Sequence, residues 1–330
     1  MPWLYATAPT VAVTSATSNH RRGVALCLLS AVGFGLMAVF AKEAYRDDVS
    51  VLTLLALRFT IAAGAFWAIV AARGPSPTGP PRRIVLAGLA LGAVGYAAQS
   101  GGYFGALTRI DASLTALLLY VYPALVFLGA LALRRDHISR RRIVALALAT
   151  GGAVLVLAGS GTGDLDALGV ALGLSAAVAY SVYILVADGV TRHIEPFHLS
   201  ALIATGAACT LWAAGLVSGS LDLGFEAGGW GWIAGLALVS TVLPISAFLA
   251  GLPKVGPATA SIVSTVEPMV SVGMAMLWFG ERLGAVQIAG GALVLAAVVL
   301  LAVNVRGRVP AVDAAGPSPA RALAHEPARG

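Results

Sequence analysis

Hydrophobic residues fall into ten long runs, separated by short breaks that are charged or rich in Pro and Gly. A helix needs about 20 mostly apolar residues to cross a hydrocarbon core about 30 Å thick. The runs therefore predict an all-α polytopic membrane protein with ten transmembrane helices. The predicted spans are residues 23–41, 50–72, 84–107, 112–133, 143–160, 167–187, 197–218, 230–252, 256–279 and 284–305.

The basic residues alternate between the two sides of these spans. With the N-terminus inside, fourteen Lys and Arg residues fall on the inner side, and only Lys42, Arg46, Arg109 and Arg282 fall in outer loops. Because cytoplasmic loops carry an excess of Lys and Arg, both termini are predicted to be cytoplasmic in a cell (inner or plasma) membrane. Residues 1–22 and 306–330 are predicted to be disordered tails.

Composition supports a protein solvated by lipid. Hydrophobic residues make up 58% of the chain and charged residues 11%, against about 25% charged in soluble domains. The net charge of +6 does not predict nucleic-acid binding, because the basic residues lie in short loops between apolar spans. Cys27 and Cys209 lie in apolar runs without a partner at metal or disulfide spacing, so no metal and no cofactor is predicted. Met1–Ser18 lacks the basic start of a cleavable signal peptide, and we expect a retained first span.

A five-span pattern occurs twice, with the second copy about 145–147 residues after the first. A repeat with an odd number of spans enters the membrane from the opposite side the second time. The pattern therefore predicts two inverted five-helix halves, residues 23–160 and 167–305, joined by an outer linker at 161–166. Carriers that work by alternating access are built in this way. The matching positions are Ser30-Ala31 with Ser175-Ala176, Ala87–Leu91 with Ala234–Leu238, and Leu107, Arg109, Pro123 and Asp136 with Leu252, Lys254, Pro268 and Glu281.

Aromatic and neutral polar side chains recur within the spans. They are spaced so that residues of one span share a helix face. They predict a substrate cavity with aromatic walls, suited to amphipathic or zwitterionic small molecules; the alternative is interhelical packing with the hydroxyls bonded to backbone carbonyls. The candidates are Tyr96, Gln99 and Tyr103 in the third span, Tyr122 in the fourth, and Tyr180 and Tyr183 in the sixth.

Two charges lie deep in predicted spans, Arg58 in the second and Glu267 in the ninth. Such charges cost roughly 2.5–3.5 kcal/mol each on insertion scales, so they should face the bundle interior, water or each other. Arg58 is a further substrate-cavity candidate, pairing with a substrate carboxylate or with Glu267; a structural pair or a snorkelling Arg is the alternative. Glu267 is a coupling candidate, because its protonation would change what it binds, and protons are the candidate coupling ion.

Three prolines interrupt the hydrogen bonding of predicted spans: Pro123, Pro244 and Pro268. Each removes a backbone donor and favours a kink. Pro123 and Pro268 are equivalent in the two repeats and predict a paired gating hinge; the alternative is a static bend.

Several of these motifs match a known family. The segment Tyr103–Pro123 resembles the third-to-fourth-span signature of the drug/metabolite transporter superfamily, EamA type. Gly251–Pro268 and then Phe279–Leu283 resemble its second copy, and Arg58-Phe59 is similar to the family's Arg-Phe pair. Asp136, within Arg-Arg-Asp-His, departs from the usual Gly-Glu. The resemblance implies ten helices, both termini inside, and a cavity lined by spans one to four and six to nine. It also implies export or exchange of small metabolites, amino acids or drug-like compounds.

We therefore predict a secondary transporter that exports or exchanges small metabolites such as amino acids by alternating access. Multidrug or organic-cation efflux and solute uptake are the alternatives within this class. The chain lacks His-Glu-x-x-His, and none of its five histidines lies mid-span, which disfavours an intramembrane enzyme. The sequence contains no filter-like segment, which disfavours a channel. It also lacks a Walker A motif, which disfavours ATP as the direct energy source.

Overall fold

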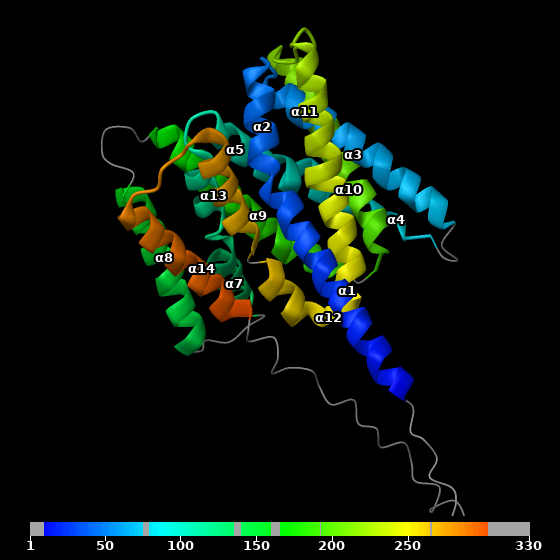
Figure 1. Cartoon of the computed structure of the whole chain (residues 1–330). Helices are drawn as coiled ribbons and strands as arrows, with labels where there is room; N and C mark the ends of the chain where they lie inside the picture. Colours follow the sequence, from blue (N-terminus) through cyan, green and yellow to red (C-terminus); the bar gives the residue numbers. More distant parts are fainter. Residues whose placement is uncertain are drawn as a thin grey trace, which may run out of the picture.

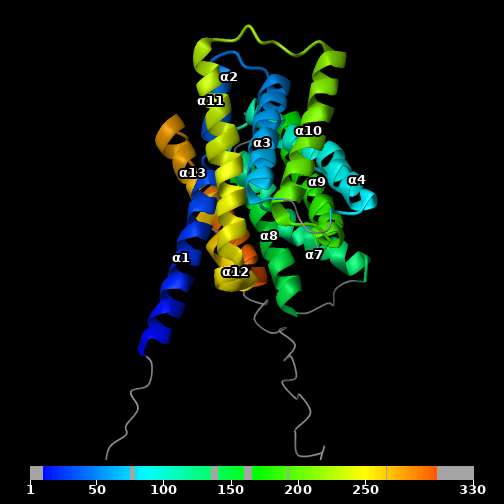
Figure 2. The same cartoon turned by 90° about the vertical axis from the view of Figure 1, so that its right-hand side faces the viewer.

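The computed structural model describes residues 10–74, 79–134, 140–159, 166–191, 193–264 and 266–302, and the regular structure of these residues is helical throughout (Figures 1 and 2). Two short segments, η1 and η2, are π-helical turns inside longer helices. In chain order the elements are α1 (Thr10–Gly35), α2 (Met37–Arg46), α3 (Val51–Arg73), α4 (Arg82–Ala90), η1 (Leu91–Tyr96), α5 (Ala97–Leu107), α6 (Ala112–Leu119), α7 (Tyr122–Ala132), α8 (Arg140–Gly159), α9 (Ala167–Thr191), α10 (Pro196–Ser218), α11 (Ala227–Ala237), η2 (Leu238–Val242), α12 (Leu243–Ser264), α13 (Val266–Phe279) and α14 (Ala285–Ala302).

Seven helical stretches are long and apolar enough to cross a membrane: Asn19–Arg46, Val51–Arg73, Arg82–Leu107, Ala112–Ala132, Ala167–Ala187, Pro196–Ser218 and Ala227–Val255. Three shorter apolar helices, Ile143–Gly159, Val266–Phe279 and Ala285–Leu300, lie where the fifth, ninth and tenth spans are predicted. Large apolar side chains point outward from the bundle, among them Val217 (91% exposed) and Leu277 (84% exposed). Such a surface is suited to lipid rather than to water.

Two segments differ from the sequence-based expectation. Helix α1 begins at Thr10, although residues 1–22 are predicted to be disordered; residues 10–22 contain no Gly or Pro, so nothing interrupts a helix that leads into the first span. Helix α12 runs through the predicted break at residues 253–255, where the Lys254 ammonium donates to the Ala250 carbonyl at 2.9 Å. Asp136, most of the predicted linker and the predicted tail at 306–330 lie outside the described residues.

Helices at equivalent places in the two predicted halves pack against one another. Helix α8 lies beside α14 (Figure 1) and α3 packs against α10. In addition, α1 packs along α12 and α5 packs along α9. These contacts pair the first span with the eighth and the third with the sixth, so the two pairs correspond to each other when the halves are exchanged. Helices α8 and α14 approach each other closely at Gly152 of α8, where an added Cβ would lie 2.6 Å from the Gly290 carbonyl oxygen of α14. Each contact therefore has a counterpart when the halves are exchanged.

The two π-helical turns also occupy equivalent places. Each begins at the last Leu of the repeated Ala-Gly-Leu-Ala-Leu segment, at Leu91 and at Leu238. A π-turn adds a residue to the helical repeat and so changes which side chains face a neighbour; such turns are frequent at functional sites. The backbone of η1 lies directly against α10 at Gly92. Only glycine leaves room there, since an added Cβ would collide with the Ile203 carbonyl.

The connections between helices gather at two opposite ends of the bundle. We call one end the five-loop face. Five pairs of successive helices have their facing ends there: α2 and α3, α5 and α6, α8 and α9, α10 and α11, and α13 and α14. It lies at the top of Figures 1 and 2, where the links after α2 and α10 are visible. These connections bond to each other. The Ser50 hydroxyl donates to the Ser220 carbonyl at 2.9 Å, and Arg109 pairs with Asp166 at 2.8 Å.

The opposite end, which we call the terminal face, is where α1 begins and α14 ends (Figure 1). There Arg73, at the end of α3, pairs with Glu195, at the start of α10, at 3.4 Å. Arg141 of α8 donates to the Leu300 carbonyl of α14 at 2.9 Å. Connections that the sequence predicts on one side of a membrane thus lie at one end of the bundle.

Candidate functional site

A cavity of about 100 Å³ lies in the middle of the bundle. It is bordered by both predicted halves, through α1, α2, α3, η1, α5, α6 and α7 of the first and α9 and α13 of the second. Its lining consists mainly of aromatic and polar side chains with one basic and one acidic residue. The lining residues are Phe34, Met37, Arg58, Tyr96, Gln99, Tyr103, Ala116, Leu119, Tyr120, Tyr122, Tyr180, Glu267 and Ser271.

Arg58 is buried at 1% exposure on the inward face of α3. Its Nε donates to the Thr241 hydroxyl at 2.9 Å. The Thr241 hydroxyl, in the π-turn η2, in turn donates to the Leu236 carbonyl at the end of α11, at 2.9 Å. The guanidinium carbon lies 4.8 Å from the Phe59 ring centroid and 5.0 Å from that of Phe104. Its Nη1 atom has no hydrogen-bond partner among the described residues.

Glu267 lies in the first turn of α13, on the wall of the same cavity. Its carboxyl accepts a hydrogen bond from the Tyr120 hydroxyl. Arg58 and Glu267 do not pair: no acidic group of the described residues lies within the 4.0 Å ion-pair distance of the guanidinium. The expectation that Arg58 binds Glu267 is therefore wrong, because α3 and α13 place the two charges apart on the cavity wall.

Tyrosines form a continuous wall between these charges. Tyr122 meets Tyr180 edge-on at a centroid distance of 4.7 Å, and Tyr180 stacks on Tyr183 at 6.0 Å. Tyr183 in turn meets Tyr96 at 5.5 Å. Of the residues predicted from sequence, Tyr183 is the one that stands behind the lining, where it supports Tyr96 and Tyr180. Tyr103 is buried within the wall.

Two lining residues that sequence reasoning missed make specific contributions. Tyr120 supplies the hydroxyl that binds Glu267, and Ser271 lies one turn after Glu267 on α13. The sequence holds a signal for each of them. Tyr120 is a second Tyr shortly before Pro123, and Ser271 lies four residues after Glu267 and so on the same helix face. Phe34 and Met37 border the cavity from the junction of α1 and α2, where ordinary apolar residues give no signal.

Two of the three predicted prolines start helices, and the third lies inside a continuous helical stretch. Pro123 follows the break between α6 and α7 and occupies the first turn of α7, and Pro268 occupies the first turn of α13. Pro244 directly follows η2 within the helical stretch Ala227–Val255. In a first turn the missing N–H would have had no helical partner, so proline costs little there.

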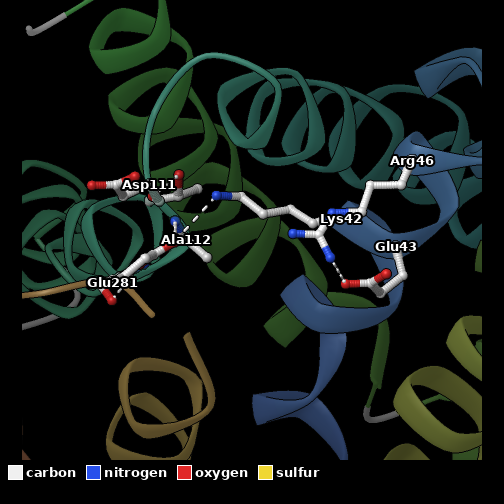
Figure 3. A network of polar contacts seen from close by, with 8 residues as sticks. Lys42, Glu43, Arg46, Asp111, Ala112 and Glu281 are labelled. Carbon is white, nitrogen blue, oxygen red and sulfur yellow. Dashed lines mark hydrogen bonds and ion pairs between the residues drawn. The ribbon is translucent and has the colours of Figure 1, made fainter. Parts of the chain in front are cut away.

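A polar cluster on the five-loop face joins the two predicted halves (Figure 3). The carboxylate of Glu281, in the α13–α14 connection, accepts bonds from the Ala112 and Ser113 backbone N–H groups at 2.9 and 3.0 Å, and from the Ser113 hydroxyl at 2.7 Å. It also pairs with Lys42 of α2 at 3.2 Å. Gly280 just before it has φ +68°, a conformation that favours glycine and turns the chain toward α6.

The electrostatics of this cluster follow from its geometry. Burial works to raise the pKa of Glu281, but the hydrogen bonds from Ser113 and Ala112 and the charge of Lys42 outweigh it and hold the pKa below its ordinary value. Burial, and then the charge of Glu281, raise the pKa of the neighbouring Asp111. The unpaired N–H groups at the start of α6 are thus capped by a carboxylate from the other half.

In the comparison with known protein families, one family model matches two successive segments of the chain. The model of the EamA-like transporter family matches residues 21–158 and again residues 167–303. The chain belongs to the EamA-like transporter family. The two matched segments lie on the two predicted halves, and membership makes the protein a multi-pass membrane protein of a transporter family.

Relatives of similar length carry the same general description. An uncharacterised transporter of Archaeoglobus fulgidus is 28% identical over 284 residues, which cover 85% of this chain and 96% of the relative. The uncharacterised transporter YcbK of Bacillus subtilis is 25% identical over 277 residues, 81% of this chain and 88% of the relative. A protein of known crystal structure shares the fold with a TM-score of 0.60 and 18% identity, covering 89% of this chain and 98% of its own.

Proposed function

We propose that this protein is a secondary carrier that exports or exchanges small metabolites, such as amino acids, across a cell (inner or plasma) membrane by alternating access. The observation that carries the proposal is the central cavity, which both halves line and which holds one basic and one acidic side chain. A carrier needs polar groups at such a place, because only a central site is reachable from either side in turn. We propose that both termini are cytoplasmic, and the excess of basic residues in the predicted inner loops supports this orientation.

The packing of the helices supports two inverted halves of five spans each. Contacts between the first and eighth spans have a counterpart between the sixth and third, as a two-fold relation in the membrane plane requires. The π-turns and the first-turn prolines of α7 and α13 recur at equivalent places as well. We take Pro123 and Pro268 as the paired hinge, because helix breaks beside the cavity allow α7 and α13 to tilt, and Pro244 as a hinge candidate beside η2.

Within the cavity, Arg58, Tyr96, Gln99, Tyr103, Tyr122 and Tyr180 are proposed to meet the substrate, with Tyr183 holding the wall. Glu267 is proposed to couple transport to protons. Its carboxyl faces the cavity beside Tyr120, away from any cation among the described residues. A carboxyl in that setting changes its hydrogen bonding when it gains a proton, which gives the two protonation states different preferred surroundings.

The carrier function is tested by transport itself. Metabolites released by cells with and without the protein identify candidate cargo, and each candidate is then assayed for counterflow in proteoliposomes holding the purified full chain. We expect labelled cargo to accumulate against unlabelled cargo without ATP. If none of the candidate solutes exchanges in liposomes that hold folded protein, the carrier proposal fails.

The coupling role is tested with Glu267→Gln, which mimics the protonated carboxyl and keeps its shape. We expect this variant to retain exchange but to lose accumulation driven by a pH gradient. Glu226→Gln is the matched control, because Glu226 is exposed at the start of α11. Accumulation at the wild-type level in Glu267→Gln would contradict proton coupling through this residue.

A further inference from the structure

A second cavity, of about 600 Å³, lies at the five-loop face. It shares no lining residue with the central cavity. Helices α5 and α8 end beside it, and α6 and α14 begin there, so it belongs to the ends of the spans and not to their middle. The charged members of its lining are three basic residues and one acidic residue: Lys42, Arg109, Arg282 and Asp111.

A neighbouring cavity of about 400 Å³ shares Lys42 and Asp111 with the larger one and adds Arg46 (Figure 3). We call the two cavities together the basic groove. Its four basic residues, Lys42, Arg46, Arg109 and Arg282, are the same four that the sequence places in outer loops, against fourteen on the inner side. Outer loops are normally poor in Lys and Arg. Gathering all four in one groove therefore concentrates the positive charge of this face in one place.

Only part of this positive charge is paired with carboxylates. Glu281 pairs with Lys42, but it also accepts three hydrogen bonds from the start of α6. Asp166 pairs with Arg109 and also accepts a backbone N–H bond at the start of α9. Arg109 donates through Nη1, and a guanidinium carries five N–H donors, so it retains others. Arg282 is exposed and makes no ion pair with any residue that the structure describes.

An anion with several acceptor oxygens fits two guanidiniums and an ammonium around one cavity. A carboxylate is satisfied by the fork of a single Arg. A phosphate monoester carries about −1.5 to −2 charge at pH 7 and three terminal oxygens, so it can contact three cations at once. The cavity volume lies within the roughly 300–1,000 Å³ of small-molecule pockets, which leaves room for the organic part of the ester.

We propose that the basic groove is a binding site for a phosphate monoester, with the phosphate oxygens on Arg109, Arg282 and Lys42. The ends of membrane spans lie at the level of lipid headgroups, so the monoester is carried either by a lipid headgroup or by a soluble molecule of the same chemistry. The site goes beyond the proposed carrier function, because it requires neither the central cavity nor transport.

The test uses the purified full chain in phosphatidylcholine nanodiscs at neutral pH and constant ionic strength. In the soluble arm, glycerol 3-phosphate is titrated while the thermal unfolding midpoint is measured. In the lipid arm, phosphatidic acid, which carries the same phosphate monoester, replaces increasing fractions of the phosphatidylcholine. Glycerate, which has a carboxylate and no phosphate, is the control solute. We expect a saturable rise of the midpoint in at least one arm, and none with glycerate.

Variants assign the binding to the groove. Arg282→Gln should weaken binding about tenfold or more, whereas Arg83→Gln, exposed near the start of α4 on the predicted inner side, should leave it unchanged. Asp111→Asn removes the carboxylate that repels an anion in the groove, and it should strengthen binding. A general loss of structure cannot strengthen binding, so the opposite signs of Arg282→Gln and Asp111→Asn are specific to the site.

The two arms distinguish the sources of the ligand. A rise with glycerol 3-phosphate supports the proposal with a soluble ligand, and a rise with phosphatidic acid alone supports it with a lipid. No rise in either arm, an equal rise with glycerate, or binding that Arg282→Gln leaves unchanged would overturn the proposal. These results are independent of counterflow in proteoliposomes, so the groove and the carrier function can fail separately.

Discussion

Gln99 presents the one side-chain amide of the cavity lining, and its oxygen accepts a bond from the Ser100 hydroxyl at 3.2 Å. Its remaining hydrogen-bonding capacity is available to a solute. We predict that Gln99→Leu lowers transport of the identified cargo about tenfold, the scale expected for a lost polar contact to a charged group. The amount of folded protein in the membrane should not change.

The matched control for Gln99 is Asn19→Leu, which removes an exposed amide from α1 far from the lining. It should transport as the wild type does. Wild-type transport by Gln99→Leu would assign this amide to helix packing instead.

The sequence predicts seven of the lining residues: Arg58, Tyr96, Gln99, Tyr103, Tyr122, Tyr180 and Glu267. Two features of the site do not follow from helical spacing. Tyr120 and Tyr122 are two positions apart and would point in different directions on one continuous helix; both reach the cavity because α6 ends just before Tyr120 and α7 begins at Tyr122. The partner of Arg58 is equally hidden, because Thr241 is oriented by a π-turn that apolar spacing does not indicate. Local breaks in helical regularity thus position the polar atoms.

Between elements, the closest approach is the crossing of η1 with α10 at Gly92. A Cβ there would collide with the Ile203 carbonyl, so one helix would have to move. We predict that Gly92→Ala destabilises the protein by about 1–3 kcal/mol, as overpacking does, and lowers its thermal unfolding midpoint. Gly64→Ala, on α3 with no atom near its added Cβ, is the control and should not lower the midpoint. Equal midpoints for the two variants would refute the close crossing.

The Glu281 cluster links α2, α6 and the end of α13, and its contribution to the stability of the fold depends on pH. Because the folded-state pKa of Glu281 lies below its ordinary value of 4.5, ionisation stabilises the fold above that value, and the contribution is lost as the pH falls through the folded-state pKa. We predict that Glu281→Gln costs about 1–3 kcal/mol at neutral pH, and that its unfolding midpoint approaches that of the wild type below pH 4.5.

Glu43→Gln is the control for loss of a carboxylate on the same face, because Glu43 contacts Arg46 and Trp278 and does not cap a helix. At neutral pH it should lower the unfolding midpoint less than Glu281→Gln does. A Glu281→Gln difference that is constant with pH would contradict the ionised cap.

Hydrophobic runs predict where most helices lie, since burial in lipid requires long apolar segments. They do not predict how helices end. The predicted break after Leu252 is helical, because Pro253 and the flanking glycines do not outweigh continued hydrogen bonding in α12. Pro123 and Pro268 similarly begin helices, where a missing donor costs least. The capping of α6 by Glu281, 168 residues from Ser113, is tertiary and has no local signal.

For the whole molecule, the repeat and the alternation of loop charge predict an inverted pair of halves, which stays a prediction. Connections predicted on the outer side meet on the five-loop face, through the pairs Arg109–Asp166 and Lys42–Glu281. In alternating access the two faces must open in turn, so the bonds of one face have to break in every cycle. In the proposed carrier, cargo identity would depend on side chains at the centre, which the repeat does not constrain.

The most direct test of alternating access is the accessibility of Ser271→Cys, on the cavity wall, in a background with Cys27→Ala and Cys209→Ala. An impermeant thiol reagent should label it from either side of the membrane. A second protein carries Lys42→Cys and Glu281→Cys, cross-linked to lock the five-loop face before Ser271→Cys is probed. The account predicts that the lock stops transport and abolishes labelling from that face while labelling from the terminal face continues. Continued transport, or continued labelling through the locked face, would contradict it.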